Sequence, residues 1–98
     1  MINRYQVVIL ILCNYFGVNE YQLKEIFKEK ENLYMAILLL NKYNCLRLDE
    51  LMMKVNVLTH RKLKNKLREA EDRILINIDF RKRYFMLEGL IEENLRNA

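Results

Sequence analysis

The chain has 98 residues, of which 52% are apolar, with two glycines, no proline and a net charge of +4. This length and composition predict one domain with a single core, and they exclude a disordered or collagen-like protein. The charge is uneven, since residues 54–83 carry ten basic and four acidic side chains while residues 1–50 carry six of each; such a concentration is typical of a surface that neutralises phosphates.

The N-terminal third of the chain predicts two helices. The first covers residues 4–16, where Asn3 is suited to be the N-cap and Gly17 the C-cap. Because apolar residues occupy all its sides, we expect this helix at the centre of the fold or in a dimer interface. The second begins at Asn19, and Gln22 three residues later indicates a capping box.

A DNA-binding motif is predicted after a third, strongly apolar helix at residues 33–44. Apolar residues at helical spacing predict its first helix over residues 48–55. A basic helix begins at Thr59 after a short turn. Alternating apolar residues then predict two strands of a hairpin, over residues 74–78 and 83–87.

These elements predict a mainly α domain with a small β-hairpin, a winged helix-turn-helix that spans residues 1–98. Residues 1–30 supply N-terminal helices that could dimerise, and residues 31–98 supply the helix-turn-helix, the wing and a short closing helix. In this architecture the second helix of the motif enters the major groove of DNA. We therefore expect the hairpin tip to approach the neighbouring minor groove.

The segment from Glu50 to Leu87 resembles the winged helix of the multiple-antibiotic-resistance regulator (MarR) family and its staphylococcal accessory regulator (SarA) branch. The resemblance is carried by Lys54-Val55-Asn56-Val57, by the spacing of Leu63, Leu67 and Ala70, and by Asp79-Phe80-Arg81-Lys82-Arg83-Tyr84-Phe85-Met86-Leu87. In that family the aspartate of the wing signature shapes the wing and the arginine reaches the minor groove. The resemblance assigns these roles to Asp79 and Arg81.

Two groups of side chains are predicted to contact DNA. Thr59 is expected to cap the basic helix, and His60 stands beside it, where backbone N–H groups and the helix dipole attract phosphate. An ordinary solvated helix face would also carry many charges, so the position of the charges within the motif favours DNA. The predicted contacts are Thr59, His60, Arg61, Lys62, Lys64 and Lys66 on the helix, and Arg81, Lys82 and Arg83 at the hairpin tip.

The cysteines, together with the lack of other motifs, limit what else the protein can be. Cys13 and Cys45 are too few to staple a secreted domain, which favours a reducing cytoplasm. Some regulators of the family that the chain resembles sense oxidants with a cysteine near the end of the first helix, and the resemblance implies this role for Cys13, two positions before Tyr15. Packing of Cys13 in the core is the simpler interpretation. One histidine and two distant cysteines predict no metal or cofactor, and no catalytic motif is present. No apolar run approaches the roughly twenty residues of a membrane span, so no membrane partner is expected.

The sequence therefore predicts a sequence-specific regulator of transcription that binds double-stranded DNA as a homodimer and is not an enzyme. The alternative is a winged-helix module that binds a protein partner, or a replication or partition factor of a phage or plasmid. The far face of the basic helix discriminates between DNA binding and protein binding, whereas a replication or partition factor would share the DNA-binding chemistry of a transcription regulator. Bare positive charge there favours DNA, whereas a contiguous apolar patch favours a protein.

Overall fold

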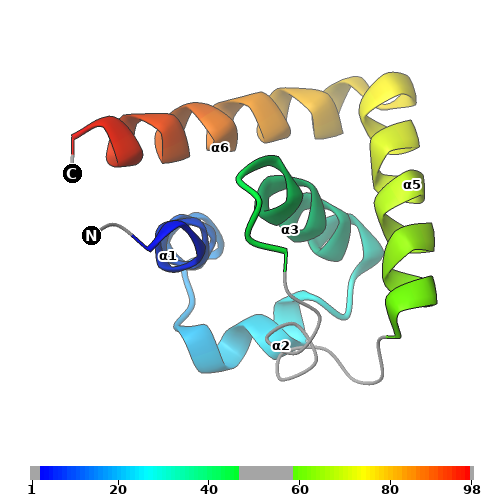
Figure 1. The fold of residues 1–98 in the computed structure, drawn as a ribbon, viewed down its shortest axis with the longest axis horizontal. Helices are drawn as coiled ribbons and strands as arrows, with labels where there is room; N and C mark the ends of the chain where they lie inside the picture. The colour runs from blue at the N-terminus through cyan, green and yellow to red at the C-terminus, as the bar shows by residue number, and fades with distance from the viewer. Residues whose placement is uncertain (1–2, 47–58, 98) are drawn as a thin grey trace.

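The computed structural model describes residues 3–46 and 59–97, and every regular element in these two stretches is a helix (Figure 1). No helix in them is long and apolar enough to cross a membrane. In chain order the elements are α1 (Arg4–Phe16), the 3-10 helix η1 (Glu20–Gln22), α2 (Leu23–Ile26), α3 (Lys30–Lys42), α5 (His60–Ile76) and α6 (Ile78–Arg96).

Helix α3 lies at the centre of the fold. Its residues from Leu33 to Leu40 are all buried, and α1, α5 and α6 each pack against it (Figure 1). A helix that is apolar on every side needs neighbours on every side. Helix α1 is also largely buried, between α3 and α6, but it leaves Leu10 with 55% of its surface exposed.

The caps predicted for the N-terminal third are confirmed. The Asn3 side chain accepts a hydrogen bond from the backbone N–H of Gln6 at 3.3 Å, and Gly17 ends α1 in the left-handed conformation with φ 67°. Asn19 and Gln22 form a reciprocal capping box, with bonds of 3.0 and 2.9 Å. The single helix expected after Asn19 is divided in the structure into η1 and the four-residue α2.

The predicted β-hairpin, and with it the winged fold class, is wrong. Residues 74–76 end α5, residues 78–87 belong to α6 with Asn77 between them, and the described stretches contain no strand. Residues 79–82 contain none of the Asn-Gly, Asp-Gly or Gly-Gly pairs that favour a tight hairpin turn. The apolar residues Phe80, Tyr84, Leu87 and Ile91 recur at helical spacing over a longer stretch than the alternation, and their burial favours a helix there.

Other expectations for the C-terminal half change with the wing. The short closing helix predicted near the C-terminus is the last part of α6. The helix expected over residues 48–55, the first of the helix-turn-helix, lies outside the described residues. The described residues therefore form a bundle of helices in which α5 and α6 meet at a corner (Figure 1).

A single extended residue, Asn77, makes the corner between α5 and α6. Its backbone N–H donates to Arg73 O at 2.9 Å and ends α5, while its side chain accepts from the N–H of Phe80 at 3.0 Å and begins α6. Asp79 lies in the first turn of α6, where a negative charge favours the helix. Arg81 Nη1 also donates to Ile74 O at 3.4 Å, across the corner.

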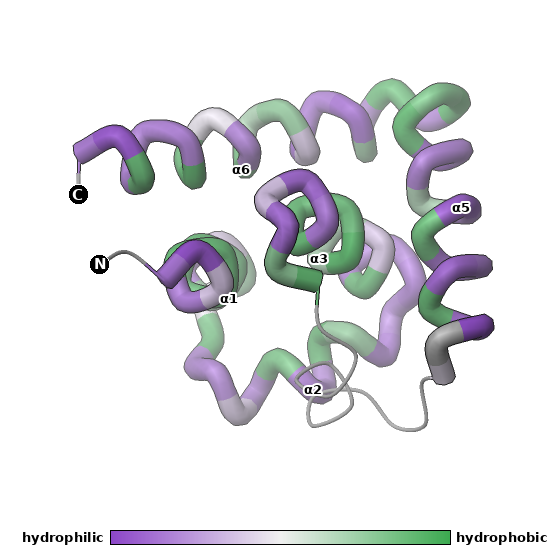
Figure 2. Tube along the Cα trace, in the orientation of Figure 1, coloured by the Kyte–Doolittle hydropathy of each residue, from purple (hydrophilic) through white to green (hydrophobic). Residues whose placement is uncertain are grey.

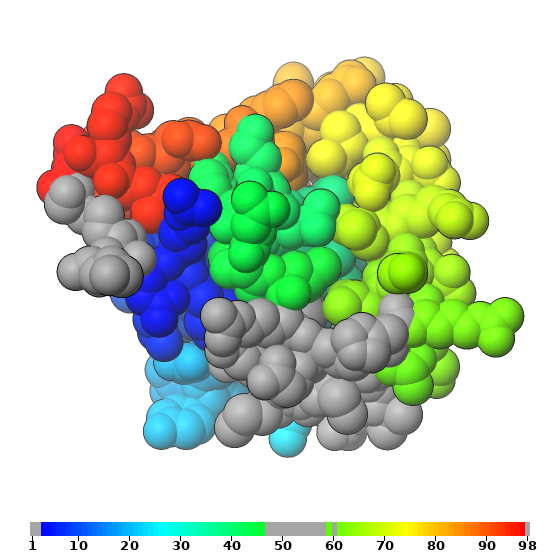
Figure 3. All heavy atoms as spheres, in the orientation of Figure 1, coloured from blue at the N-terminus to red at the C-terminus, as the bar shows by residue number. Residues whose placement is uncertain are grey.

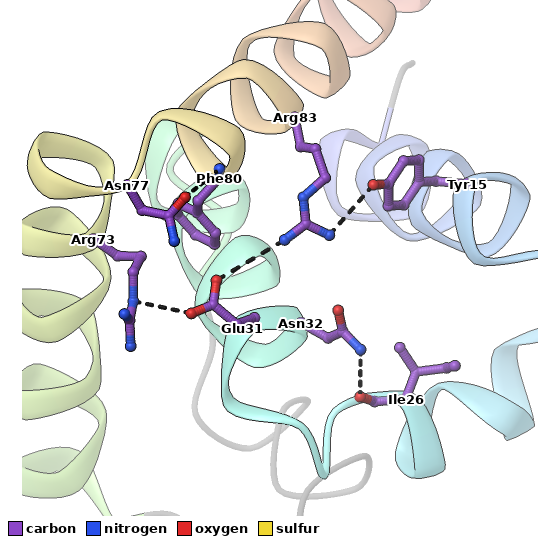
Figure 4. A network of polar contacts seen from close by, with 8 residues as sticks. All are labelled: Tyr15, Ile26, Glu31, Asn32, Arg73, Asn77, Phe80 and Arg83. Carbon is purple, nitrogen blue, oxygen red and sulfur yellow. Dashed lines mark hydrogen bonds and ion pairs between the residues drawn. The ribbon is translucent and has the colours of Figure 1, made fainter.

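Glu31 at the start of α3 joins this corner to the rest of the fold (Figure 4). Its Oε1 lies 3.0 Å from Nε of Arg73 on α5, and its Oε2 lies 3.9 Å from Nη2 of Arg83 on α6. Arg83 Nη1 also donates to the Tyr15 hydroxyl on α1 at 3.5 Å. One half-buried carboxylate thus links α3 to the two helices on either side of the corner.

Replacing this carboxylate by an amide tests the link. We expect Glu31→Gln to lower the free energy of unfolding by about 1 kcal/mol, because two arginines lose one shared partner. Urea denaturation followed by circular dichroism measures the change. Glu25→Gln is the control, since it breaks an exposed pair with Lys28 within one turn, and less than about 0.5 kcal/mol is expected. Equal losses would contradict the role of Glu31.

Gly89 tests the helical assignment of the predicted hairpin region. It lies exposed within α6, and a methyl group added there meets no atom within 4 Å. We expect Gly89→Ala to raise the free energy of unfolding by about 0.5–1 kcal/mol, since alanine loses less backbone entropy in a helix. Gly17→Ala, at φ 67°, is expected to lower it by about 1 kcal/mol. Urea denaturation of both variants checks these opposite signs.

Candidate nucleic-acid interface

Helix α5 carries most of the cations that were predicted to contact DNA. Its predicted N-cap is confirmed, because Oγ1 of Thr59 accepts the backbone N–H of Lys62 at 3.2 Å. The helix begins at His60, but the predicted contact of His60 with DNA concerns a side chain outside the described part of the structure. The positive end of the helix dipole lies at this end of α5.

One side of α5 is buried and the other is open to solvent. Leu63 and Ala70 are buried against the core, and Leu67 and Ile74 pack beside them. The opposite side carries Arg61, Lys64 and Arg68, which are all exposed and lie on one face because their spacing is three and then four residues. The first turns of α5 project from the right-hand edge of the molecule in Figure 3.

Charge changes sign along α5. Residues 60–68 contain five basic side chains and no acidic one, and the first acid is Glu69. No ion pair joins Arg61, Lys62, Lys64 or Arg68 to an acid within the described stretches. The cations and the positive end of the helix dipole therefore act at the same place, and their potentials add.

Lys66 is held more closely than the other predicted cations of α5. It is half-buried, with Nζ 5.9 Å from the centre of the Tyr34 ring and 3.9 Å from Oε2 of Glu69. The Tyr34 hydroxyl donates to Glu69. Burial and this hydrogen bond raise the pKa of Tyr34 to about 12, and the same bond lowers the pKa of Glu69. Lys66 therefore serves the packing of α5 on α3 as well as the charged surface.

The structure adds cationic and polar groups that the sequence-based prediction did not include. Asn65 and Arg68 are exposed beside Arg61 and Lys64, as the helical spacing of these four residues implies. Lys66 also lines a surface hollow with Lys24, Lys28 and Lys30, and with Glu25, which forms an ion pair with Lys28 at 2.9 Å. The sequence gives no sign of this group of lysines, because Lys24, Lys28 and Lys30 lie more than thirty residues before Lys66 and come to the same hollow only when the chain folds.

The structure does not place the predicted hairpin-tip residues beside the cations of α5. Arg81 and Arg83 make the hydrogen bond and ion pair at the corner, and Lys82 is exposed on the outer side of α6. The cations of residues 61–68 lie in the N-terminal half of α5, a 17-residue helix that is about 25 Å long. The proposed approach of Arg81 and Lys82 to a minor groove depended on the wing, and α6 replaces it.

The cysteines lie in the core and not at a surface site. Cys13 and Cys45 are both buried, each with 8% of its surface exposed. A redox sensor needs an accessible thiolate, which burial does not favour. Among the residues that the structure describes, no three side chains of histidine, cysteine, aspartate or glutamate are grouped as metal ligands.

Comparisons of this chain with protein-family models, curated proteins and solved structures give no match. The resemblance to MarR-type regulators stays a prediction. Its longest motif, residues 79–87, lies within α6, where Asp79 occupies the first helical turn and Arg81 bonds across the corner. The candidate interface is therefore judged on the geometry of α5.

The contact between Tyr34 and α5 gives a pH-dependent stability. In the unfolded chain Tyr34 loses its proton near pH 10, whereas in the folded protein its pKa is raised to about 12. The resulting stability is complete below pH 10 and is lost as the pH rises toward 12. Urea denaturation across this range should therefore show a steeper loss for the wild type than for Tyr34→Phe. Parallel losses would contradict the assignment.

Proposed function

We propose that this chain binds double-stranded DNA through the cationic face of α5, defined as Arg61, Lys62, Lys64, Asn65 and Arg68, and regulates transcription by this contact. The main support is the accumulation of basic side chains at the N-terminal end of an exposed helix, without an ion pair to a described acid. A sequence-specific role would follow from contacts with base edges. Regulation of transcription implies a location in the cytoplasm, where cysteines stay reduced.

The placement of these cations is unfavourable for α5 alone, which supports a ligand of opposite charge. Basic residues stabilise a helix at its C-terminal end and destabilise it at its N-terminal end. Here Arg61 and Lys62 lie in the first turn, and that turn has no acidic residue. Local features that weaken a helix are often found at functional sites. A phosphate at this end would neutralise the side chains and the dipole together.

The chemistry of the cationic face suits the major groove. An α-helix is about 10–12 Å wide with its side chains, and the major groove is about 12 Å wide. Arg61 and Arg68 can each donate two hydrogen bonds to a guanine, and the Asn65 amide can pair with an adenine. In this proposal Lys62 contacts a phosphate, and Lys24, Lys30 and Lys66 of the neighbouring hollow add phosphate contacts, which fix the position of the protein without reading the sequence.

A protein partner is the rival interpretation, and the same helix offers one feature that suits it. The last turn of α5 exposes Leu75 and Ile76, with 73% and 76% of their surfaces accessible, and the corner is hydrophobic in Figure 2. These residues lie at the opposite end of α5 from the cationic face. The charge of the N-terminal half favours DNA, and the apolar corner makes a protein the expected ligand if DNA does not bind.

Binding to duplex DNA across a salt series tests the proposal. We expect fluorescence anisotropy with a labelled random duplex to show a negative slope of log affinity against log salt. Arg61→Gln/Lys64→Gln should reduce that slope by up to about 2 per bound chain, because each lost phosphate contact releases about one counterion fewer. Affinity at low salt should fall at least about tenfold.

A matched variant separates local contacts from net charge. Arg4→Gln/Lys42→Gln removes the same two charges from exposed positions on α1 and at the end of α3. We expect its salt slope to stay close to that of the wild type. Equal effects of the two double variants would reduce the binding to general attraction by net charge. No binding at low salt would reject DNA as the ligand.

A further inference from the structure

Helix α6 has a second long face that nothing in the described structure covers. Phe80, Tyr84, Leu87 and Ile91 bury one side, while the opposite side forms the upper edge of the molecule in Figures 1 and 3. We call this opposite side the outer face of α6. Its residues are all exposed: Ile78, Asp79, Lys82, Phe85, Met86, Gly89, Leu90, Glu93 and Arg96.

The middle of the outer face is apolar. Phe85, Met86 and Leu90 expose 55%, 47% and 40% of their surfaces, and Ile78 near the start of the helix exposes 59%. Leu90 also lines a hollow with Leu10 of α1, so the apolar surface continues from α6 onto a second helix. Contiguous exposed apolar surface with a charged border is typical of an interaction site.

We propose that the outer face of α6 binds the same face of a second copy of this chain, with the two helices antiparallel. In such a dimer the two-fold axis passes beside the midpoint between Leu87 and Glu88. Each residue then lies at the level of the residue equally far on the other side of that midpoint. A two-fold interface requires a surface that is complementary to itself in this way.

Charge complementarity favours a second copy in this orientation. Lys82 and Glu93 lie equally far from the midpoint and near the centre line of the face, so each Lys82 meets Glu93 of the second copy. Asp79 and Arg96 also reach the same level at the two ends. In a parallel pair Lys82 would face Lys82 and Glu93 would face Glu93, which is repulsive.

Gly89 fits the same arrangement. Glycine is a poor helix former, and outside its own stretch of helix no atom of the described residues lies within 4 Å of a Cβ built at this position, so packing within the described structure does not require it. In the antiparallel dimer, Gly89 lies beside Met86 and close to Phe85 of the second copy. Its missing side chain allows the two helices to approach closely there, as small residues do at helix contacts.

The inference does not depend on the proposed function, because the two surfaces lie on different helices. The outer face belongs to α6, and the cationic face belongs to the N-terminal half of α5. Dimerisation is measured without DNA, and DNA binding is measured below the concentration at which dimers form. The failure of one proposal is therefore distinguishable from the failure of the other.

Sedimentation equilibrium of the full chain, from about 1 µM to 1 mM, covers the affinity range of weak protein pairs. We expect reversible dimers of the wild type. Lys82→Glu should weaken dimerisation at least about tenfold, because it places like charges together at two symmetric positions. Lys82→Glu/Glu93→Lys should restore the affinity to within about threefold of the wild type, since the pair is exchanged and not removed.

Two further variants separate this contact from effects on folding. Gly89→Gln should keep or increase the helical signal and thermal stability of the chain while it weakens the dimer at least about tenfold. Lys24→Glu makes the same charge change away from α6 and should leave the dimer unchanged. A chain that stays monomeric throughout the range would overturn the proposal. The proposal would also be overturned if Lys82→Glu left the dimer intact, or if Lys82→Glu/Glu93→Lys failed to restore it.

Discussion

The central constraint on this fold is that α3 has no polar side between Leu33 and Leu40. Every residue of that segment is buried, so other helices must cover it from several directions. Helices α1, α5 and α6 do so, and each turns an apolar stripe inward. Each covering helix then keeps one side in solvent, where its side chains are free to serve binding. The two candidate surfaces of this chain are such outward sides, one on α5 and one on α6.

Ion pairs decide which of the many cations take part in packing and which stay available. Arg73 and Arg83 share the carboxylate of Glu31, which offsets one of their two positive charges close to the core. Lys66 lies against Tyr34 and Glu69. The cations left without a described acidic partner on α5 gather in its first turns. The net charge of +4 therefore understates the positive potential at the N-terminal half of α5, because residues 60–68 carry five basic side chains and no acidic one.

The parts of the fold that could be predicted from the sequence depend on local chemistry. Asn3, Gly17 and Thr59 act as caps within three or four residues of the groups that they bond, so their roles could be inferred directly. The wing could not be judged in this way. Alternation of apolar residues over five positions fits a strand or a helix end, and two of them, Ile76 and Ile78, are exposed. Asn77 followed by an acidic residue was the available signal for a helix start.

The same corner determines how the two candidate surfaces are related. Asn77 is the only residue between α5 and α6, and its hydrogen bonds to both helices, with that from Arg81 to Ile74, hold their relative direction. If α6 pairs with a second copy, the corner fixes where the two α5 helices point. Two-fold pairing of recognition helices sets the spacing of DNA half-sites. In this chain, that spacing would therefore follow from the length of α6 and the angle at one asparagine.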